Sequence, residues 1–361
     1  MKKYKVCVYA ICKNEEKFAK KWYESMKEAD EIYVLDTGST DNTVQILKDL
    51  GAHVDVKIIN PWRFDVARNE SLKLVPKDAD IYVCTDLDEI FVPGWRKDLE
   101  DSWNDNVVQA RYLYNWSLDK YGNPNVSFYY DKIHNKDFEW KYPIHEALTY
   151  IGNKEYCDIT LKNTVLNHYQ DQNKNRSSYL PLLELAVKEF PNDTRCLYLL
   201  TREYLIYSNF DLCIKTGLKY LEFADNAFYG EKNAVMRYIG RSYKNLNEYH
   251  KAKEYFEKSI NIAPDLRDGY IELGMLEFDH YNYGNSIAYF EKALLIKEDC
   301  PYAINEIFSW DDTVYTLLAR AYFYTERYEK ALEYIDIAIK MNPDNQENIN
   351  LRNTIETKIL V

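Results

Sequence analysis

The apolar residues of the chain follow one pattern in residues 1–170 and another in residues 171–361. In the first part, short runs rich in valine, isoleucine and tyrosine predict strands, and segments with an apolar residue every three or four positions predict helices. The predicted strands are 4–11, 31–36, 53–59 and 81–86, and the predicted helices are 14–28, with Asn14 as its N-cap, 39–50 and 64–75. Strands that alternate with helices through short connections imply a parallel sheet. We therefore expect residues 1–170 to form an α/β domain.

Longer apolar runs follow within the same domain, at 107–116, 126–133, 144–150 and 159–169. They predict strands that are longer than the preceding ones. This change of pattern marks the part of the domain where we expect a pocket for an acceptor substrate.

Residues 171–361 have a helical period and an internal repeat, after a polar linker at 171–176 and a bridging helix at 178–190. The recurring positions are Gly240, Tyr243, Tyr249, Ala252 and Phe256, then Gly274, Glu277, Tyr283, Ser286 and Phe290 after 34 residues, and Ala319, Tyr322, Tyr328, Ala331 and Ile335 at 79 residues from the first set. This spacing resembles the tetratricopeptide repeat, whose units stack on their neighbours and leave a concave face. The 11 residues in excess of two repeats lie near 300–310 and predict a loop that could project from the stack.

Composition narrows the class of protein. The chain has 361 residues, of which 46% are apolar and 29% charged, as is typical of a soluble globular protein with two domains. It has no run of 18 apolar residues and no leader-like segment, and its seven cysteines are scattered. We therefore expect a cytoplasmic protein without a disulfide framework. The net charge of −12 argues against nucleic acid as the main partner.

Three acidic residues, Asp86, Asp88 and Glu89, lie at the end of the fourth predicted strand and just beyond it. Residues i and i+2 of a strand point the same way, so Asp86 and Asp88 can converge at its carboxyl end, where open α/β sheets bind ligands. Two carboxylates with little opposing charge suit a hard divalent cation, Mg²⁺ or Mn²⁺. The alternative for these residues alone is an acidic turn in contact with solvent.

Two further polar side chains are expected at the same edge of the sheet. Asp36 precedes a turn at Gly38 and could accept hydrogen bonds from a base or a ribose, while the amides of the turn face a polar ligand. Arg68 opens the segment before the fourth strand and could hold a diphosphate through paired donors. The alternatives are a turn-forming role for Asp36 and a surface salt bridge for Arg68.

Taken together and in this order, four phrases resemble the family 2 glycosyltransferases with the GT-A fold, over roughly residues 4–170. The phrases are Ile-Cys-Lys-Asn-Glu-Glu at 11–16, Val-Leu-Asp-Thr-Gly-Ser-Thr-Asp-Asn-Thr at 34–43, Ala-Arg-Asn at 67–69 and Asp-Leu-Asp-Glu at 86–89. The resemblance implies an enzyme that uses a nucleotide sugar. It also implies that Asp36 contacts the uridine and that Asp88 reaches a metal ion on the diphosphate.

A later phrase, Trp-Lys-Tyr-Pro-Ile-His-Glu at 140–146, resembles that of a bacterial subgroup in which such a domain is joined to tetratricopeptide repeats. The sublancin-type peptide S-glycosyltransferases have this layout. The resemblance implies that His145 completes the metal ligands or touches the diphosphate, and that Glu146 takes the proton of the acceptor. Neighbouring side chains of a strand face opposite ways, so both can serve one site only at a bend or a strand end. The alternative is a buried histidine and a salt-bridged glutamate.

Other residues near these phrases are also candidates. Members of the subgroup often carry an arginine in the phrase before the tryptophan, where this chain has Lys132, which keeps the charge but not the forked donors. His168 is a weaker candidate for the site. If Glu146 is not the base, Asp131 or Glu89 could take that role.

We therefore predict a GT-A glycosyltransferase domain at 1–170 and an all-α tetratricopeptide-repeat domain at 171–361. The predicted activity is metal-dependent, inverting transfer from a nucleotide sugar, which we expect to be a UDP-sugar, to a peptide, protein or glycan acceptor. The candidate residues are Asn14, Glu15, Asp36, Gly38, Ser39, Arg68, Asp86, Leu87 and Lys132 for the nucleotide sugar, Asp86, Asp88 and His145 for Mn²⁺ or Mg²⁺, and Glu146 for catalysis. The repeats are expected to hold the acceptor or a second copy of the chain.

Three alternatives stay open at this point. The first is a cell-envelope polysaccharide glycosyltransferase, and the second is a non-catalytic repeat scaffold that binds a protein partner. A nucleotidyltransferase on a related sheet is less favoured, because no glycine-rich, lysine-bearing phosphate loop follows the first strand.

Overall fold

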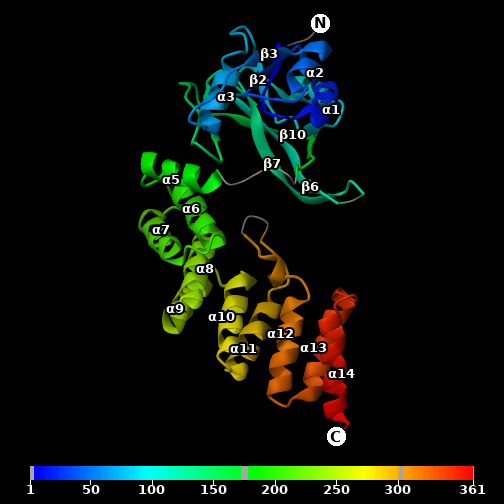
Figure 1. Ribbon diagram of the computed structural model, residues 1–361, viewed down its shortest axis with the longest axis vertical. Helices are drawn as coiled ribbons and strands as arrows, with labels where there is room; N and C mark the ends of the chain where they lie inside the picture. Colours follow the sequence, from blue (N-terminus) through cyan, green and yellow to red (C-terminus); the bar gives the residue numbers. More distant parts are fainter. Residues whose placement is uncertain (1–3, 120, 172–177, 301–303, 361) are drawn as a thin grey trace. The chain divides into compact units, whose positions relative to one another are not determined.

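The structure is a computed structural model that describes residues 4–119, 121–171, 178–300 and 304–360. The chain forms two compact units, Met1–Leu182 and Leu183–Val361 (Figure 1). The first unit is α/β and the second is all-α, as the sequence predicts. Of the predicted linker at 171–176, only Asp171 lies within the described residues.

An eight-stranded sheet forms the centre of the first unit. In spatial order its strands are β3 (His53–Val56), β2 (Glu31–Asp36), β1 (Val6–Cys12), β4 (Ile81–Cys84), β7 (Pro124–His134), β6 (Gln109–Leu118), β10 (Asp158–His168) and β5 (Glu89–Phe91). The first four strands are parallel, as predicted, whereas β7 pairs antiparallel with both β4 and β6. The sheet is therefore mixed.

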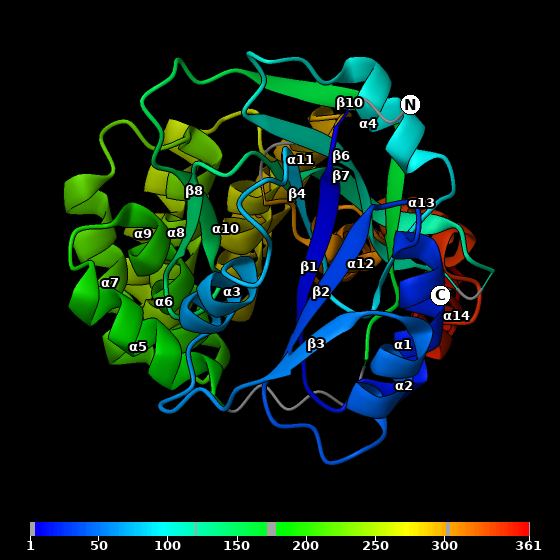
Figure 2. The ribbon, with the colours of Figure 1, turned by 90° about the horizontal axis from the view of Figure 1, so that it is seen from above.

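Both faces of this sheet are covered (Figure 2). The helices α1 (Glu16–Met26), α2 (Thr43–Leu50) and α4 (Trp95–Ser102) pack on one face, where Trp22 and Trp95 belong to the largest apolar cluster. The helix α3 (Phe64–Leu72) and the two-stranded sheet of β8 (Phe138–Lys141) and β9 (Ala147–Tyr150) lie on the other face, where Tyr9 packs with Trp140. The alternation of side chains along β1 supplies apolar residues to both clusters.

Three local features differ from the prediction. Asn14 is not an N-cap, because α1 starts after Glu15, which makes no side-chain capping bond. The predicted strand at 144–150 is shorter, since β9 begins only after a bend in which Tyr142 and His145 have φ angles of 77° and 50°. The strand β5 has three residues, and a segment that short has no periodicity to detect.

Paired helices form the second unit (Figure 1). They are α5 (Tyr179–Glu189), α6 (Thr194–Ile206), α7 (Phe210–Phe223), α8 (Tyr229–Asn245), α9 (Tyr249–Ile262), α10 (Arg267–Asp279), α11 (Tyr283–Leu295), the 3₁₀ helix η1 (Ile307–Ser309), α12 (Thr313–Tyr324), α13 (Tyr328–Met341) and α14 (Gln346–Ile359). A Cβ atom added to Gly240 or Gly274 would lie 2.5 Å from the ring of Phe256 or Phe290, respectively. The small residues of the repeat pattern are therefore required where paired helices touch. Among the described helices, none combines the length and the apolar character of a membrane span.

The excess residues between α11 and α12 are hydrogen-bonded to the repeats at Ile304, Glu306 and Ser309. The guanidinium group of Arg237 donates to Glu306 Oε1 at 3.0 Å and to the Ile304 carbonyl at 2.9 Å. The buried carboxylate of Asp268 accepts from the Glu306 amide at 2.8 Å and from Ser309 Oγ at 2.7 Å. The described part of this segment, 304–310, therefore does not project from the stack as expected.

Candidate active site

The turns that follow β1 and β2 are joined at the carboxyl edge of the sheet. Asn14 Oδ1 accepts a hydrogen bond from the Thr40 amide at 2.7 Å, and the Asn14 amide donates to Ser39 Oγ at 2.8 Å. The Glu15 amide donates to Thr43 Oγ1 at 2.8 Å. The φ angle of 55° at Asn14 lies in the left-handed region, which asparagine tolerates better than most residues. The first two phrases of the sequence thus form one structural corner.

Asp36 is fully buried inside the turn after β2. Its Oδ1 accepts from the amides of Gly38 and Ser39, each at 2.9 Å, and its Oδ2 accepts from the Ser39 hydroxyl. The thiol of Cys12 lies 3.4 Å from Oδ2. Gly38 has a φ angle of 110°, a conformation that favours glycine. Asp36 and Gly38 therefore shape this turn, and the contact of Asp36 with uridine stays a prediction.

The acidic residues after β4, the partly exposed Asp86 and the buried Asp88 and Glu89, form a cluster with cations from distant elements. Asp86 lies 2.6 Å from the guanidinium of Arg68 and 3.5 Å from Lys132 Nζ. Glu89 accepts from the Asp86 amide at 2.9 Å and lies 3.3 Å from Lys132 Nζ. Burial raises the pKa of Glu89, although the charge of Lys132 acts in the opposite direction. Leu87 is 2% exposed and packs in the core, so it can offer a ligand only its backbone.

Arg68 connects this acid cluster to the His-Glu phrase. Arg68 is 3% exposed, and its Nε donates to Glu146 Oε1 at 3.0 Å while its Nη2 lies 2.6 Å from Asp86 Oδ1. Burial opposes the charge of Arg68, but the carboxylates of Asp86 and Glu146 outweigh it and raise its pKa. Arg68 therefore positions two carboxylates, and its predicted contact with a diphosphate would be an additional role.

His145 and Glu146 lie at the bend between β8 and β9, which is the condition under which both could serve one site. Glu146 points to Arg68, as its hydrogen bond shows. Within the described ranges, no group of three or more His, Cys, Asp or Glu side chains is arranged to hold a metal ion. The structure thus does not bring Asp86, Asp88 and His145 together as one ligand set.

His168, which the sequence made only a weaker candidate, lies beside Asp88 and Glu89. Antiparallel pairing of β10 with β5 places it opposite Glu89, and its Nε2 lies 3.5 Å from Asp88 Oδ2. Burial opposes protonation of the ring, but the hydrogen bond with Asp88 outweighs it and raises the pKa of His168. In the sequence, His168 is a polar residue at the end of a predicted strand. Its pairing with the three-residue strand β5 could not be predicted from the sequence.

Asp88 and His168 together fit a divalent cation that is completed by a substrate. Mg²⁺ is usually bound by one or two carboxylates together with waters and phosphate oxygens, and Mn²⁺ accepts imidazole as well. Asp88 is 4% exposed and adjoins the imidazole, whereas Asp86 is already neutralised by two cations. The donor set of the described residues is therefore compatible with a metal–diphosphate complex.

Comparison with known families assigns both units. Residues 7–156 match the glycosyl transferase family 2 model. Residues 239–266 match a tetratricopeptide repeat, and residues 312–360 match the Fis1 C-terminal tetratricopeptide repeat. The chain therefore combines a family 2 glycosyltransferase domain with C-terminal tetratricopeptide repeats.

Known proteins are similar to parts of the chain. Anaphase-promoting complex subunit 6 of Arabidopsis thaliana is 31% identical over 105 residues, which are 29% of this chain and 18% of that protein. Outer dynein arm-docking complex subunit 4 of Danio rerio is 26% identical over 227 residues, or 61% of this chain and 41% of that protein. The chain thus spans less than half the length of either relative.

Solved structures also resemble part of the chain. The APC/C hetero-tetramer Cut9–Hcn1 has a TM-score of 0.41 and 15% identity, with 50% of this chain and 33% of that chain covered. YrrB, described as a tetratricopeptide-repeat protein with an unusual peptide-binding site, has a TM-score of 0.38 and 16% identity, with coverages of 48% and 81%.

Proposed function

We propose that this protein is a metal-dependent, inverting glycosyltransferase that moves a sugar from a UDP-sugar to a peptide, protein or glycan acceptor. The observation that supports this most is the acid cluster of Asp86, Asp88 and Glu89 at the carboxyl edge of a family 2 domain. Asp88 and Glu89 are buried, and Arg68 and Lys132 are the cationic partners of the cluster. Ligands of open α/β sheets bind at this edge. Buried acids with specific charge partners are also typical of functional sites.

The residues of the site have distinct roles in the proposed reaction. Asp88, with His168, would hold Mn²⁺ or Mg²⁺, which when bound neutralises the charge of the departing diphosphate. Glu146 accepts the proton of the acceptor hydroxyl or thiol, while Arg68 fixes one of its carboxylate oxygens. The deprotonated acceptor attacks the anomeric carbon, the bond from that carbon to the diphosphate oxygen breaks, and the configuration inverts. Lys132 places its positive charge against Asp86 and Glu89 beside the leaving group.

A screen of nucleotide sugars tests this proposal. Purified protein with Mn²⁺ should slowly release sugar and UDP from at least one UDP-sugar, because water can replace the acceptor. Binding of nucleotide and metal without sugar release from any of them would favour the non-catalytic scaffold instead. Transfer to a polysaccharide primer but not to peptides would favour the polysaccharide alternative.

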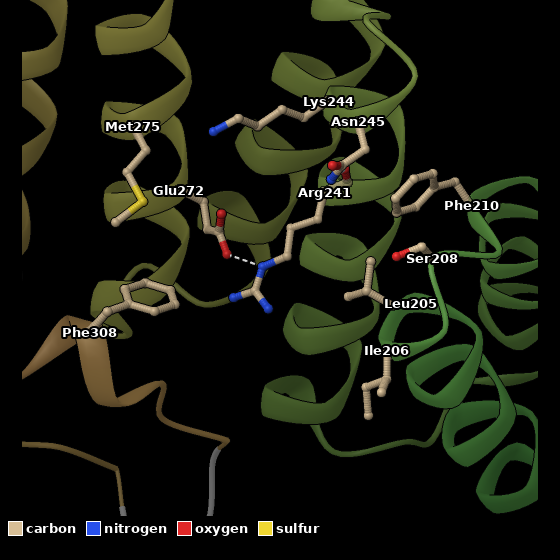
Figure 3. Close-up of a pocket in the computed structure, with 10 residues that line it drawn as sticks. All are labelled: Leu205, Ile206, Ser208, Phe210, Arg241, Lys244, Asn245, Glu272, Met275 and Phe308. Carbon is tan, nitrogen blue, oxygen red and sulfur yellow. Dashed lines mark hydrogen bonds and ion pairs between the residues drawn. The ribbon is translucent and has the colours of Figure 1, made fainter. Parts of the chain in front are cut away.

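A pocket in the second unit supports a further role in holding a protein acceptor (Figure 3). It has a volume of about 550 Å³, within the range of ligand pockets. Its lining residues come from the four helices α6, α7, α8 and α10, the α6–α7 connection and η1: Leu205, Ile206, Ser208, Phe210, Arg241, Lys244, Asn245, Glu272, Met275 and Phe308. Arg241 and Glu272 form an ion pair in the middle of this group, and both apolar and polar side chains surround it (Figure 3). A mixed apolar and polar wall of this kind suits an extended peptide with one large apolar side chain.

The 3₁₀ helix η1 offers a matched pair of variants for this role. Phe308 lines the pocket, whereas its neighbour Ile307 does not and is 82% exposed. Phe308→Ala should weaken the binding of fluorescent peptides that carry a single Leu or Phe, and Ile307→Ala should not. If no such peptide binds and light scattering shows a dimer that Phe308→Ala dissociates, the pocket holds a second copy of the chain instead.

A further inference from the structure

Aromatic rings gather on one face of the β6–β7 hairpin. Tyr114 and Phe128 are opposite each other in the two strands, with ring centroids 5.3 Å apart. The Tyr130 ring lies 5.1 Å from that of Tyr114, and the His168 ring stacks on Tyr114 at 5.9 Å with an interplanar angle of 22°. These four residues are called the aromatic platform below.

The platform borders the acid cluster directly. The Tyr114 hydroxyl donates to Glu89 Oε1 at 3.0 Å, and Lys132 Nζ lies 4.7 Å from the centroid of the Tyr130 ring. The pairing of β6 with β7 is regular at Tyr114 and Phe128 but shifts register on either side, between Ala110 and Tyr112 and between Asn115 and Ser117. Such bulges are frequent next to active sites, where they re-aim side chains. The rings and the charged groups therefore belong to one continuous surface.

Exposure within the platform is uneven. Tyr114 is 4% exposed and supports the surface from below, whereas Phe128 is 43% exposed. A cross-strand aromatic pair stabilises a hairpin by itself, which is the structural explanation for these rings. That explanation does not require the rings to adjoin buried ionised groups. An open ring next to a few converging polar groups is the composition of a ligand pocket.

A pyranose ring matches this surface. It has a face of C–H groups, which packs against an aromatic ring, and a rim of hydroxyls, which need donors and acceptors nearby. Phe128 offers the open ring, and the acid cluster with Lys132 offers the polar partners. A purely apolar peptide side chain would use the ring but leave those polar groups without a ligand.

We propose that the aromatic platform holds a pyranose ring, either that of the donor or that of an acceptor. The proposal rests on the glycosyltransferase function and adds the place where the sugar lies. Phe128 is the stacking residue, and Tyr114 positions it from the neighbouring strand.

Two variants in adjacent positions test the platform. Phe128→Ala removes the open ring. Tyr129→Ala removes a ring that is 60% exposed on the same strand but points to the other face. Both variants remove one hairpin aromatic, so a loss that is specific to Phe128→Ala does not report hairpin stability. Equal melting temperatures of the two variants establish that the comparison is fair.

The ligands are UDP, three UDP-sugars (glucose, galactose and N-acetylglucosamine) and the methyl glycosides of the same sugars. If the platform holds the donor sugar, Phe128→Ala lowers the affinity for a UDP-sugar by roughly tenfold in calorimetry and leaves the affinity for UDP unchanged. If it holds an acceptor sugar, UDP-sugar affinity is unchanged, and saturation transfer to a methyl glycoside in the presence of UDP is lost. Tyr129→Ala should behave like the wild type in both assays.

Two results would overturn the proposal for the platform. In the first, Phe128→Ala and Tyr129→Ala bind every ligand with the same affinity. In the second, the wild-type protein binds none of the UDP-sugars and none of the methyl glycosides. Failure of the glycosyltransferase proposal looks different. In that case UDP does not bind to the wild type, yet a methyl glycoside still binds and Phe128→Ala still removes it.

Discussion

Two acidic strand ends of the first unit are built in opposite ways. At the end of β2, Asp36 is satisfied by donors of its own turn, from Gly38 and Ser39. After β4, Asp86 is neutralised by Arg68 and Lys132, which come from other elements. A carboxylate bound by its own turn fixes the local backbone. One that is neutralised by distant cations can exchange those partners with a charged ligand, so we infer that the β2 end shapes the site and the β4 end carries the chemistry.

The largest expected effect is at Asp88. Asp88→Ala should abolish transfer and the dependence on divalent ions, because it removes the carboxylate proposed to hold the cation. Circular dichroism should show an intact fold. Asp101→Ala, in an exposed i,i+4 pair with Lys97 on α4, is the control and should keep full activity. Full activity of Asp88→Ala, or undiminished activity in excess chelator, would remove the metal from the account.

The next largest effect is expected at Glu146. Glu146→Gln should keep UDP-sugar binding and reduce turnover by about 10²–10⁴, the range for a lost general base. A thiol acceptor would reduce this loss, because a thiol is partly ionised near neutral pH. Glu139→Gln in the adjacent strand β8 is the control and should have no effect, because the Glu139 side chain is partly exposed and pairs with Lys141. If Glu146→Gln retains its turnover, the base is another acid such as Glu89 or Asp131.

Asp36 should have a smaller and different effect. Asp36→Ala is expected to weaken UDP binding by about 1–3 kcal/mol, the cost of losing a hydrogen-bonded charged group. Because Asp36 is buried in its turn, the melting temperature should fall as well. Asp36→Asn keeps one oxygen for the turn amides and should be the more stable of the two variants. Unchanged UDP affinity in calorimetry for both variants would remove Asp36 from the nucleotide site.

The smallest effect on the nucleotide site is expected from truncation of the repeats after Asp265, between α9 and α10. The cut removes Leu273, which packs with Phe256, so a capping helix is needed to cover that surface. The truncated protein should bind UDP as well as the full chain but lose transfer to a protein acceptor, since Met275 and Phe308 of the pocket are absent. Transfer at the full-length rate, with an unchanged oligomeric state in light scattering, would contradict a role of the repeats in either function.

The sequence predicted those parts of the molecule that are encoded by local pattern. The parallel strands β1 to β4 and the repeat contact of Gly240 with Phe256 follow from periodicity and from small residues at fixed spacing. The antiparallel insertion of β7 beside β4 does not, because pairing between distant strands leaves no signal in a single segment.

The sequence predicted single candidate residues of the site but not the ion pairs that connect them. Local phrases made Asp86 and Glu146 candidates. The ion pairs that connect both of them to Arg68 depend on three segments that meet only in the fold. In the repeats, the excess residues near 300–310 have no hydrophobic period of their own, and we expected them to form a projecting loop. The buried partners Arg237 and Asp268, which hold the segment down, lie on other helices.

The most direct test of the contrast between the two strand ends is a titration with Mn²⁺ followed by electron paramagnetic resonance in the presence of UDP. The wild-type protein should bind one Mn²⁺ tightly, and Asp36→Ala should bind it as well once UDP is saturating. With Asp88→Ala, the Mn²⁺ spectrum should be the same as that of Mn²⁺ and UDP without protein. Wild-type Mn²⁺ affinity in Asp88→Ala, together with its loss in Asp36→Ala, would contradict the account and place the metal at the end of β2.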